Sequence, residues 1–477
     1  MPELTIEEDA VSLIDGAPSS AVGRRVGVRS AYTQQIIGEV VEADDAVVDR
    51  AVRGARHAFT DWSARSLDER AQIVRRAADI IDEQGEGIAD LVTAEMGMPI
   101  ELARVTQWRL PASVLRTAAD RVADVHWTEQ IPGATLHRRP SGVVAAISPW
   151  NMPTYQTVAK VAGALVAGCT VVIKPSVQTP FDAALFVRLL HTAGVPAGAV
   201  QLVQGSGSVT GAALSRHPGV NHVSFTGSVE AGKTVAGLAA TTLARCTLEL
   251  GGKSPAVILP GSDLERVVPA VLASGLVNAG QACNATTRVL VPREHLGAVE
   301  ELIRAQVSSF TMGDPFDPAT RIGPLSSIAH GEGVLGFIQR ALTDGGRLIA
   351  GAPERAQGLG PGMFIAPTVI ADLPRHAEAV QEEIFGPVLV FQPYDGVDDA
   401  IATANDTRFG LSAEVWGLPD EAVAVAGRIR AGQVKVNGVR TRERPGVPFG
   451  GVGDSGYGRE LGALGIEEFT DVSAVMA

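Results

Sequence analysis

The sequence predicts an α/β protein with two stacked, doubly wound parallel-sheet domains and a small β extension. Three observations indicate this fold. From residue 143 onward, short apolar segments alternate with stretches of helical period, a pattern typical of βαβ units on a parallel sheet. A second series of the same kind begins at Ala256. The segment Val125–Pro140 partly alternates and carries Pro132-Gly133, which is typical of an extended hairpin.

The elements are expected in a simple order along the chain. Residues 1–120 should be mainly helical, because Asp45–Trp62 and Ser66–Gln84 carry apolar residues three and four positions apart. The strands expected in the first sheet are Val143–Ser148, Thr170–Lys174, Ala199–Val203 and His222–Phe225. The strands expected in the second sheet include Val289–Val291 and Pro387–Phe391, with long helical stretches such as Glu294–Val307 between them.

These elements divide the chain into three units. We expect residues 1–121 and 141–247, with part of 454–466, to form the first domain, and residues 248–453 to form the second. Residues 122–140 and 467–477 should form the β extension. Ligands of parallel sheets bind beyond the carboxyl ends of the strands, so the functional residues are expected at those ends.

Composition excludes several classes of function. The 477 residues carry 53 acidic and 40 basic side chains and a formal net charge of −13, which opposes binding to nucleic acid or to an anionic membrane surface. The most apolar stretch, Val161–Ile173, is shorter than the roughly 20 residues that a membrane-spanning helix needs. The N-terminus has no basic start and no apolar signal core, so we expect no export.

Cysteine usage indicates the compartment. The chain has only Cys169, Cys246 and Cys283, too few for a disulfide framework in so long a sequence. We therefore predict a cytoplasmic protein in which each thiol is free. We predict no metal site.

Two glycine-rich segments match phosphate-binding patterns by spelling. Residues 227–234 match the Walker A spacing, follow a predicted strand and open a predicted helix, but no strand before them ends in an acidic metal ligand. A site for a nucleoside triphosphate and a site for some other phosphate group both remain open here. Residues 451–456 spell a dinucleotide fingerprint, but too little chain follows for a βαβ unit, so we interpret them as a loop.

Two further segments carry reactive side chains. Glu249 ends an apolar strand and precedes two glycines; such a carboxylate suits a general base, although alone it is more often a salt-bridge partner. Cys283 follows a glycine turn among small polar residues, which can expose backbone amides to an oxyanion. A lone cysteine is usually only a small buried residue, and Cys169 and Cys246 are expected to be of that kind.

Eight short motifs occur in a fixed order along the chain. They are Pro149-Trp150-Asn151-Met152-Pro153, Lys174-Pro175-Ser176, Phe225-Thr226-Gly227-Ser228, Glu249-Leu250-Gly251-Gly252-Lys253, Gly280-Gln281-Ala282-Cys283, Glu383-Ile384-Phe385-Gly386-Pro387, Pro448-Phe449-Gly450-Gly451 and Ser455-Gly456-Tyr457-Gly458-Arg459-Glu460. The set resembles the aldehyde dehydrogenase superfamily over nearly the whole chain. The resemblance implies that the first domain binds a coenzyme, the second carries catalysis, and residues 227–234 form the turn for the coenzyme phosphate.

The resemblance also implies catalytic roles. Cys283 would attack the aldehyde as a thiolate, the side-chain amide of Asn151 and the backbone amide of Cys283 would bind the oxyanion, and Glu249 would activate the water that hydrolyses the thioester. Family members that form acyl-CoA generally lack a carboxylate at the position of Glu249, so we predict a free carboxylic acid as the product. Lys160 and Glu460 occupy positions that form a proton relay in many members, and a purely structural ion pair is the open alternative.

The coenzyme, NAD or NADP, is implied in the same way. Glu383 would hold the nicotinamide ribose and Phe385 would lie next to the nicotinamide ring, while Trp150 and Lys174 would line the adenosine end. The full set of expected coenzyme contacts is Ile147, Trp150, Lys174, Ser176, Val177, Gly207, Phe225, Thr226, Gly227, Ser228, Leu250, Gly251, Glu383 and Phe385.

One position departs from the family pattern. Many NAD-preferring members have glutamate three residues after the lysine of the Lys174 motif, where it repels a 2′-phosphate. This chain has Val177 there, while Lys174 and Ser176 remain. We therefore predict use of both coenzymes or a preference for NADP.

The substrate tunnel is inferred from the turn after Asn151 and the residues that flank Cys283. Its expected lining is Met152, Tyr155, Gln156, Ala159, Ala282, Asn284 and Phe449. Gln156 and Ala159 stand where members that oxidise apolar aldehydes often carry bulkier apolar groups, and Arg440, Arg442 and Arg444 lie in a loop near the mouth. A polar or carboxylate-bearing aldehyde is therefore one hypothesis, although loop arginines are most often only solvated.

Three functions from different classes are kept. The first is an NAD(P)-dependent aldehyde dehydrogenase, the second a catalytically silent or binding protein on the same fold, and the third, more distant, a phosphotransferase using residues 227–234. The family resemblance also implies a homodimer or homotetramer in which Val125–Pro140 and the strand near Asp471–Met476 pair across subunits, because an exposed hairpin otherwise leaves sheet edges unpaired.

Overall fold

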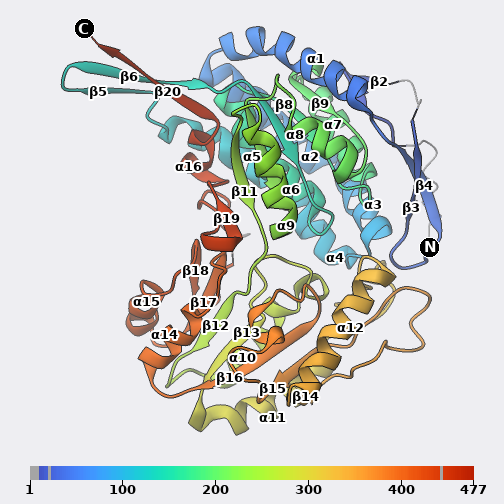
Figure 1. Cartoon of the computed structure of the whole chain (residues 1–477), viewed down its shortest axis with the longest axis vertical. Helices are drawn as coiled ribbons and strands as arrows, with labels where there is room; N and C mark the ends of the chain where they lie inside the picture. Colours follow the sequence, from blue (N-terminus) through green and yellow to red (C-terminus); the bar gives the residue numbers. More distant parts are fainter. Residues whose placement is uncertain (1–9, 20–22, 441–443, 477) are drawn as a thin grey trace.

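The computed structural model describes residues 10–19, 23–440 and 444–476, which form two α/β bodies and a projecting β arm (Figure 1). Parallel pairing dominates both large sheets, and the predicted α/β class is confirmed. The chain passes from the first sheet to the second through residues 250–254, directly after Glu249. The end of this strand therefore lies where the two bodies meet.

The first sheet has a parallel centre with antiparallel strands added at both edges. Its order is β19 (Gly456–Tyr457), β11 (Arg245–Glu249), β10 (His222–Thr226), β7 (Val143–Ile147), β8 (Thr170–Lys174), β9 (Val200–Leu202), β1 (Leu13–Ile14) and β2 (Ala17–Pro18). All four predicted strands of this sheet are present. Alternate residues of β7 enter two different cores, Val144 and Ala146 one and Val143 and Ala145 the other, so helices cover both faces.

The second sheet is parallel except for one edge strand. Its order is β14 (Arg347–Ala350), β15 (Thr368–Ala371), β16 (Val388–Tyr394), β13 (Arg288–Pro292), β12 (Pro255–Ile258), β17 (Ser412–Trp416) and β18 (Gln433–Val436), with β14 antiparallel to β15. The predicted strands at Val289–Val291 and Pro387–Phe391 correspond to β13 and β16.

The helices fill the intervals between strands. They are α1 (Asp45–Ala64), α2 (Leu67–Gln84), α3 (Glu86–Met96), α4 (Ile100–Ala103), α5 (Leu110–Arg121), α6 (Pro153–Ala167), α7 (Phe181–Thr192), α8 (Ala212–Ser215), α9 (Val229–Ala240), α10 (Leu264–Gly275), α11 (Leu296–Gln306), α12 (Ile328–Thr343), α13 (Glu378–Gln381), α14 (Val397–Asn405), α15 (Pro419–Ala426) and α16 (Gly462–Glu467). No helix among the described residues is both long and apolar enough to cross a membrane.

The prediction of a mainly helical N-terminal region is wrong before residue 45. The described residues there form β1 and β2 and a separate hairpin of β3 (Arg25–Arg29) and β4 (Ile36–Val41). In Arg25–Arg29 the apolar residues Val26 and Val28 alternate with Arg25, Gly27 and Arg29, which is a strand signal of period two. β1 and β2 have two residues each, which is too short for any periodicity.

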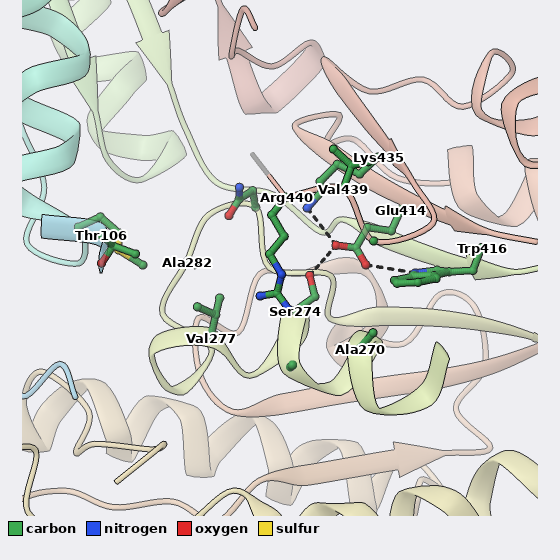
Figure 2. Close-up of a pocket in the computed structure, with 14 residues that line it drawn as sticks. Thr106, Ala270, Ser274, Val277, Ala282, Glu414, Trp416, Lys435, Val439 and Arg440 are labelled. Atoms are coloured by element: carbon green, nitrogen blue, oxygen red, sulfur yellow. Dashed lines mark hydrogen bonds and ion pairs between the residues drawn. The ribbon is translucent and has the colours of Figure 1, made fainter. Parts of the chain in front are cut away.

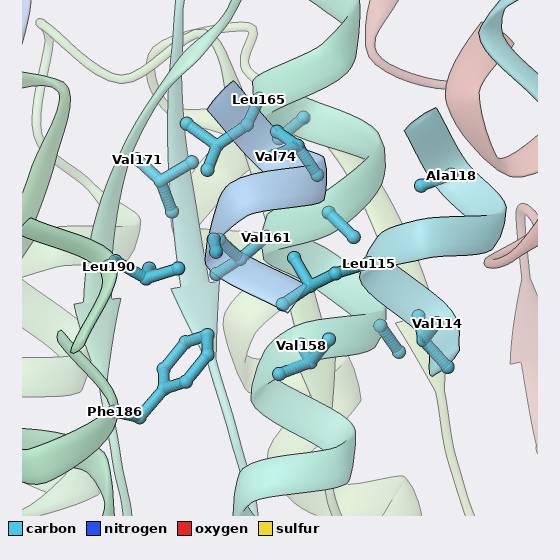
Figure 3. Packing of buried hydrophobic residues seen from close by; sticks show 14 of the residues in the cluster. Val74, Val114, Leu115, Ala118, Val158, Val161, Leu165, Val171, Phe186 and Leu190 are labelled. Carbon is cyan, nitrogen blue, oxygen red and sulfur yellow. The ribbon is translucent and has the colours of Figure 1, made fainter. Parts of the chain in front are cut away.

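Helix α6 forms the centre of the first body and fixes the segment that precedes it. Pro153 begins the helix at its first turn, and Gly168 ends it in the left-handed conformation with φ 100°. Every residue of α6 except Tyr155 is buried. Figure 3 shows Val158, Val161 and Leu165 of this helix packed among side chains of α2, α5, α7 and β8. A helix buried on all sides holds Asn151 and Met152 firmly at its N-terminal end.

The predicted hairpin forms the projecting arm. β5 (Thr128–Ile131) and β6 (Ala134–Pro140) are antiparallel, and β20 (Thr470–Met476) pairs with the other edge of β6 along its whole length. Figure 1 shows this three-stranded sheet extending away from both bodies.

Candidate active site

Two neighbouring cavities share the side chains of Cys283 and Asn151. One, of about 240 Å³, is lined by Pro149, Trp150, Asn151, Thr226, Gly227, Ser228, Leu250, Gly251, Cys283, Glu383 and Phe385. The other, of about 100 Å³, is lined by Thr106, Leu110, Asn151, Met152, Tyr155, Gln156, Ala282, Cys283, Asn284 and Phe449. Below, these are called the coenzyme cavity and the tunnel. The thiol of Cys283 therefore faces two separate binding spaces.

A left-handed turn after α10 presents Cys283. Asn278, Ala279 and Gly280 all have positive φ values, of 51°, 56° and 74°. A Cβ on Gly280 would lie 2.0 Å from the carbonyl oxygen of Gly386, so only glycine fits this close backbone approach. This contact joins the cysteine turn to the loop that carries Glu383.

Reciprocal hydrogen bonds fix Asn151 against the cysteine turn. The side-chain amide of Asn151 donates to the carbonyl of Gln281 at 3.0 Å, and the amide of Asn278 donates to the carbonyl of Asn151 at 3.0 Å. An amide group has two N–H donors, so Asn151 keeps one for an oxygen bound beside Cys283. The sequence gives no sign of the supporting roles of Asn278 and Gln281, because these contacts form only in the folded chain.

The thiol of Cys283 is protonated at neutral pH. Desolvation, together with the charges of Glu383 and Glu249, raises the pKa of the thiol to about 12. Attack on a carbonyl therefore requires removal of the proton within the site.

The carboxylate of Glu249 is buried and lacks partners. The residue is 1% exposed at the end of β11, and neither oxygen has a hydrogen-bond partner among the described residues. Burial, reinforced by the charge of Glu460 and opposed by that of Lys160, raises its pKa well above the usual range. The alternative of a strand-end salt bridge is thus not found in the described part of the chain. Glu249 lines neither cavity, although its charge acts on Cys283.

The predicted contact between Lys160 and Glu460 is present. The Nζ atom of Lys160 lies 2.5 Å from Oε1 of Glu460, and both side chains are at most 1% exposed. Lys160 also donates to the hydroxyl of Thr226 at 2.6 Å, and the hydroxyl of Ser224 donates to Glu460 at 3.3 Å. Breaking such a buried pair by removing one partner typically costs about 3–5 kcal/mol.

The wall of the coenzyme cavity combines the N-terminal end of α9 with the carboxylate of Glu383, which suits one part of a dinucleotide. Gly227, Ser228 and Gly251 line the cavity. Helix α9 begins directly after Ser228, so its N-terminal end faces this wall. The hydroxyl of Ser228 accepts a hydrogen bond from Ala231 N at 3.3 Å. Oε1 of Glu383 accepts a hydrogen bond from Gly252 N at 3.0 Å, and a Cβ on Gly251 would lie 2.2 Å from Oε2. The second carboxylate oxygen remains able to accept from ribose hydroxyls. Burial raises the pKa of Glu383 to about 7.

The other predicted coenzyme residues lie outside this cavity. Ile147 and Phe225 are buried at the carboxyl ends of their strands, Ser176 and Val177 are half-buried beyond β8, and Gly207 is exposed. Lys174 donates to the carbonyl of Gly205 at 2.9 Å, while Ser206 N of the same peptide donates to Glu42 at 3.0 Å. The peptide bond between Gly205 and Ser206 therefore contacts a basic side chain through its carbonyl and an acidic side chain through its N–H. It lies just before Gly207. Nothing in the sequence indicates that Glu42 forms this contact with Ser206.

Trp150, which was expected at the adenosine end of the coenzyme, lines the coenzyme cavity together with Cys283. Its ring lies 5.6 Å from the ring of Phe385 and 5.6 Å from that of His330, centroid to centroid, in the cavity of Cys283. Trp150 lies between β7, which ends at Ile147, and α6, which begins at Pro153. Nε2 of His330 on α12 donates to the carbonyl of Phe385 at 2.8 Å. A lone histidine in a helix gave no signal of this contact.

The Walker A interpretation does not fit the geometry of residues 227–234. Lys233, which would have to reach a phosphate, projects from α9 with its side chain 62% exposed and pairs with Glu230 at 3.5 Å. Among the described residues no group of three or more His, Cys, Asp or Glu is arranged to hold a metal ion.

All but one of the predicted tunnel residues line the tunnel. Ala159 instead lies beside a separate small void, with Val114 and Ala118 of α5. The face of α6 that begins at Met152 is covered by α5 two turns further on, which removes Ala159 from the tunnel. Thr106 and Leu110 complete the lining and were missed, because they reach the site only through packing of α5 and of the segment before it.

Comparison with known proteins agrees with the motifs. A sequence model of the Aldehyde dehydrogenase family matches residues 18–475. The 3-succinoylsemialdehyde-pyridine dehydrogenase of a Pseudomonas species is 41% identical over 455 residues, which are 95% of both chains. The geranial dehydrogenase of Castellaniella defragrans is 38% identical over 467 residues, which are 96% of both chains.

A solved structure gives the same result. A mutant of aldehyde dehydrogenase C from Pseudomonas syringae, complexed with NAD⁺ and octanal, is 41% identical and superposes with a TM-score of 0.95 over 98% of this chain and 96% of the other. The chain belongs to the aldehyde dehydrogenase family and is an NAD(P)-dependent oxidoreductase that oxidises aldehydes to carboxylic acids.

Proposed function

We propose that the chain converts an aldehyde to the free carboxylic acid with Cys283 as nucleophile and Glu249 as base. The observation that carries this proposal is that Cys283 and Asn151 line both the coenzyme cavity and the tunnel. An aldehyde carbon in the tunnel can therefore bond to sulfur while it faces the neighbouring cavity. The alternatives of a silent protein and a phosphotransferase are not favoured.

The first stage forms a thioester. The sulfur of Cys283, after losing its proton to a base, bonds to the aldehyde carbon, and the carbonyl oxygen gains the negative charge. The free N–H of Asn151 and the backbone N–H of Cys283 donate to that oxygen; losing one such donor typically lowers the rate about 10²–10³-fold. When NAD⁺ or NADP⁺ is bound, its nicotinamide accepts the hydride from this carbon. The carbon–oxygen double bond then re-forms, which leaves an acyl group on sulfur.

The second stage releases the acid. Glu249 takes a proton from water, the oxygen of that water bonds to the acyl carbon, and the carbon–sulfur bond breaks to give back the Cys283 thiolate. The raised pKa of Glu249 suits a base that works near neutral pH. Stoichiometric release of free acid without coenzyme A tests this proposal, and a strict requirement for coenzyme A would contradict it.

We further propose that Lys160 and Glu460 tune and relay the proton of Glu249. In Glu460→Gln the amide keeps hydrogen-bonding capacity but loses the charge that raises the pKa of Glu249. That pKa should fall, so Glu249 stays ionised to lower pH and the acidic limb of the kcat profile should move to lower pH. Lys160→Met removes the opposing charge and should move the limb to higher pH. If kcat depends on pH in the same way in both variants and in the wild type, Lys160 and Glu460 form a purely structural ion pair and the proposal is wrong.

We propose that the coenzyme choice is relaxed. Val177 adds no carboxylate near Lys174, while Glu42 contributes a negative charge on the far side of the Gly205–Ser206 peptide. The expectation is measurable turnover with both NAD⁺ and NADP⁺, or a preference for NADP⁺. Near-complete exclusion of NADP⁺ would contradict it.

A single substitution tests the role of Val177. Val177→Glu should lower kcat/KM for NADP⁺ about tenfold or more relative to NAD⁺, because the new carboxylate repels the 2′-phosphate. Val177→Gln is the matched control, with nearly the same size and no charge. Dissociation constants of both coenzymes, measured by fluorescence, should show the same ratio.

We propose a homodimer or homotetramer held by the β arm. Along the arm Ile131, Val472, Val475 and Met476 are exposed, at 39%, 56%, 46% and 82%, and β5 leaves one sheet edge unpaired within the described chain. Light scattering should give a dimer or tetramer, and the double substitution of Val472 and Val475 by glutamate should dissociate it. A monomeric wild type would contradict the proposal.

We propose the cytoplasm as the compartment. All three cysteines are free thiols. Thiol titration of the denatured protein from freshly lysed cells should therefore count every cysteine, and a disulfide-linked species would contradict this assignment.

A further inference from the structure

Figure 2 shows the residues that line an additional cavity of about 160 Å³, here called the outer chamber, whose wall does not include Cys283. It shares Thr106, Met152, Ala282 and Asn284 with the tunnel. Part of its wall is apolar, formed by Ala270 and Val277 on one side and Trp416 on another. A substrate longer than the tunnel would therefore place its far end in this chamber.

The charges of Glu414 and Lys435 in the chamber wall cancel. These residues pair across β17 and β18 at 3.0 Å, and their side chains are only 6% and 11% exposed. Glu414 also accepts from the hydroxyl of Ser274 at 2.6 Å and from the indole N–H of Trp416 at 3.3 Å. Both carboxylate oxygens of Glu414 thus already have partners in the chamber wall.

Arg440 supplies the remaining charge of the chamber. It has no ion-pair partner among the residues that the structure describes, and Figure 2 shows its side chain extending among Lys435, Ser274 and Val277. Of the other two loop arginines, Arg442 lies outside the described residues and Arg444 does not line the chamber.

The backbone that carries Arg440 is anchored. The side chain of Asn437 accepts from Gly417 N at 3.0 Å and donates to the carbonyl of Gly417 at 3.0 Å. Gly438 has φ 88°, and a Cβ there would lie 2.6 Å from the ring of Trp416. The packing of Gly438 against Trp416 and the two hydrogen bonds of Asn437 fix the backbone from which the Arg440 side chain extends.

We propose that Arg440 binds a carboxylate at the far end of the substrate, so that the preferred aldehydes are ω-oxo acids with an apolar middle. The chamber is a local positive site in a protein of formal net charge −13. A guanidinium group matches a carboxylate with two parallel hydrogen bonds, and the apolar wall suits the carbon chain between the two ends. This inference rests on the proposed function and names its substrate class.

The test compares each ω-oxo acid with its own methyl ester, from succinic semialdehyde to longer homologues. At the best chain length the wild type should have a kcat/KM at least about tenfold higher for the acid, mainly through KM, and salt should reduce this preference. Arg440→Gln should lose the preference and leave the ester unchanged, while Arg440→Lys should keep part of it. Arg53→Gln, which removes an exposed charge on α1, is the matched control.

The outcomes separate the two proposals. Equal kcat/KM values for acid and ester at every chain length, or equal losses for both in Arg440→Gln, would overturn only the role of Arg440. Failure of every aldehyde to reduce either coenzyme would overturn the proposed function itself.

Discussion

Cys283→Ala is expected to abolish aldehyde-dependent reduction of NAD⁺ and NADP⁺, with a loss in kcat of at least about 10³-fold. Alanine leaves no atom that can bond to the aldehyde carbon, although Asn151 and the cavity walls remain. Coenzyme affinity should stay within about twofold, because the Sγ atom is only one part of the coenzyme cavity wall. Steady-state absorbance and fluorescence titration measure the two quantities separately.

Cys246→Ala is the matched control for this substitution. Cys246 is half-buried on β11 and lines neither the coenzyme cavity nor the tunnel, so its removal should leave kcat nearly unchanged. Activity in Cys283→Ala above a hundredth of the wild-type value would mean that a different group attacks the aldehyde.

Glu249→Gln is expected to stop the cycle after the first turnover. Glutamine has nearly the same shape but cannot take a proton from water, so the thioester should form and then persist. Stopped-flow absorbance should show a burst of about one reduced coenzyme per active site, followed by a steady rate at least about 10²-fold below wild type.

Hydroxylamine distinguishes a base from a merely structural residue. This nucleophile attacks thioesters without base activation, so it should restore turnover of Glu249→Gln and release a hydroxamate. Loss of the burst itself would contradict the assignment, because Glu249 would then act before the thioester forms.

Local patterns made much of the site predictable. Glu249 ends a strand, and Cys283 follows a glycine in a turn, so their positions are set by nearby backbone. The parallel strands from residue 143 could be recognised because each is a short apolar run next to a helical stretch. The first body's small edge strands β1 and β2 could not, since each has only two residues and β1 is joined to the sheet through the distant strand β9.

The remaining contacts depend on packing between distant segments. His330 meets Trp150 across the two bodies, whereas Glu42 meets Ser206 within the first body and Ser274 meets Glu414 within the second. Ala159 has the right helical spacing for the tunnel, but its face of α6 is already covered by α5. Spacing predicts which residues share a face and says nothing about what covers that face.

The most direct test of the account is the mass of Glu249→Gln after reaction with coenzyme and an aldehyde. The peptide that contains Cys283 should gain the mass of the corresponding acyl group, and peptides with Cys169 and Cys246 should be unchanged. An acyl group on any other residue, or free acid released at the wild-type rate with Cys283 unmodified, would contradict the assignment of nucleophile and base.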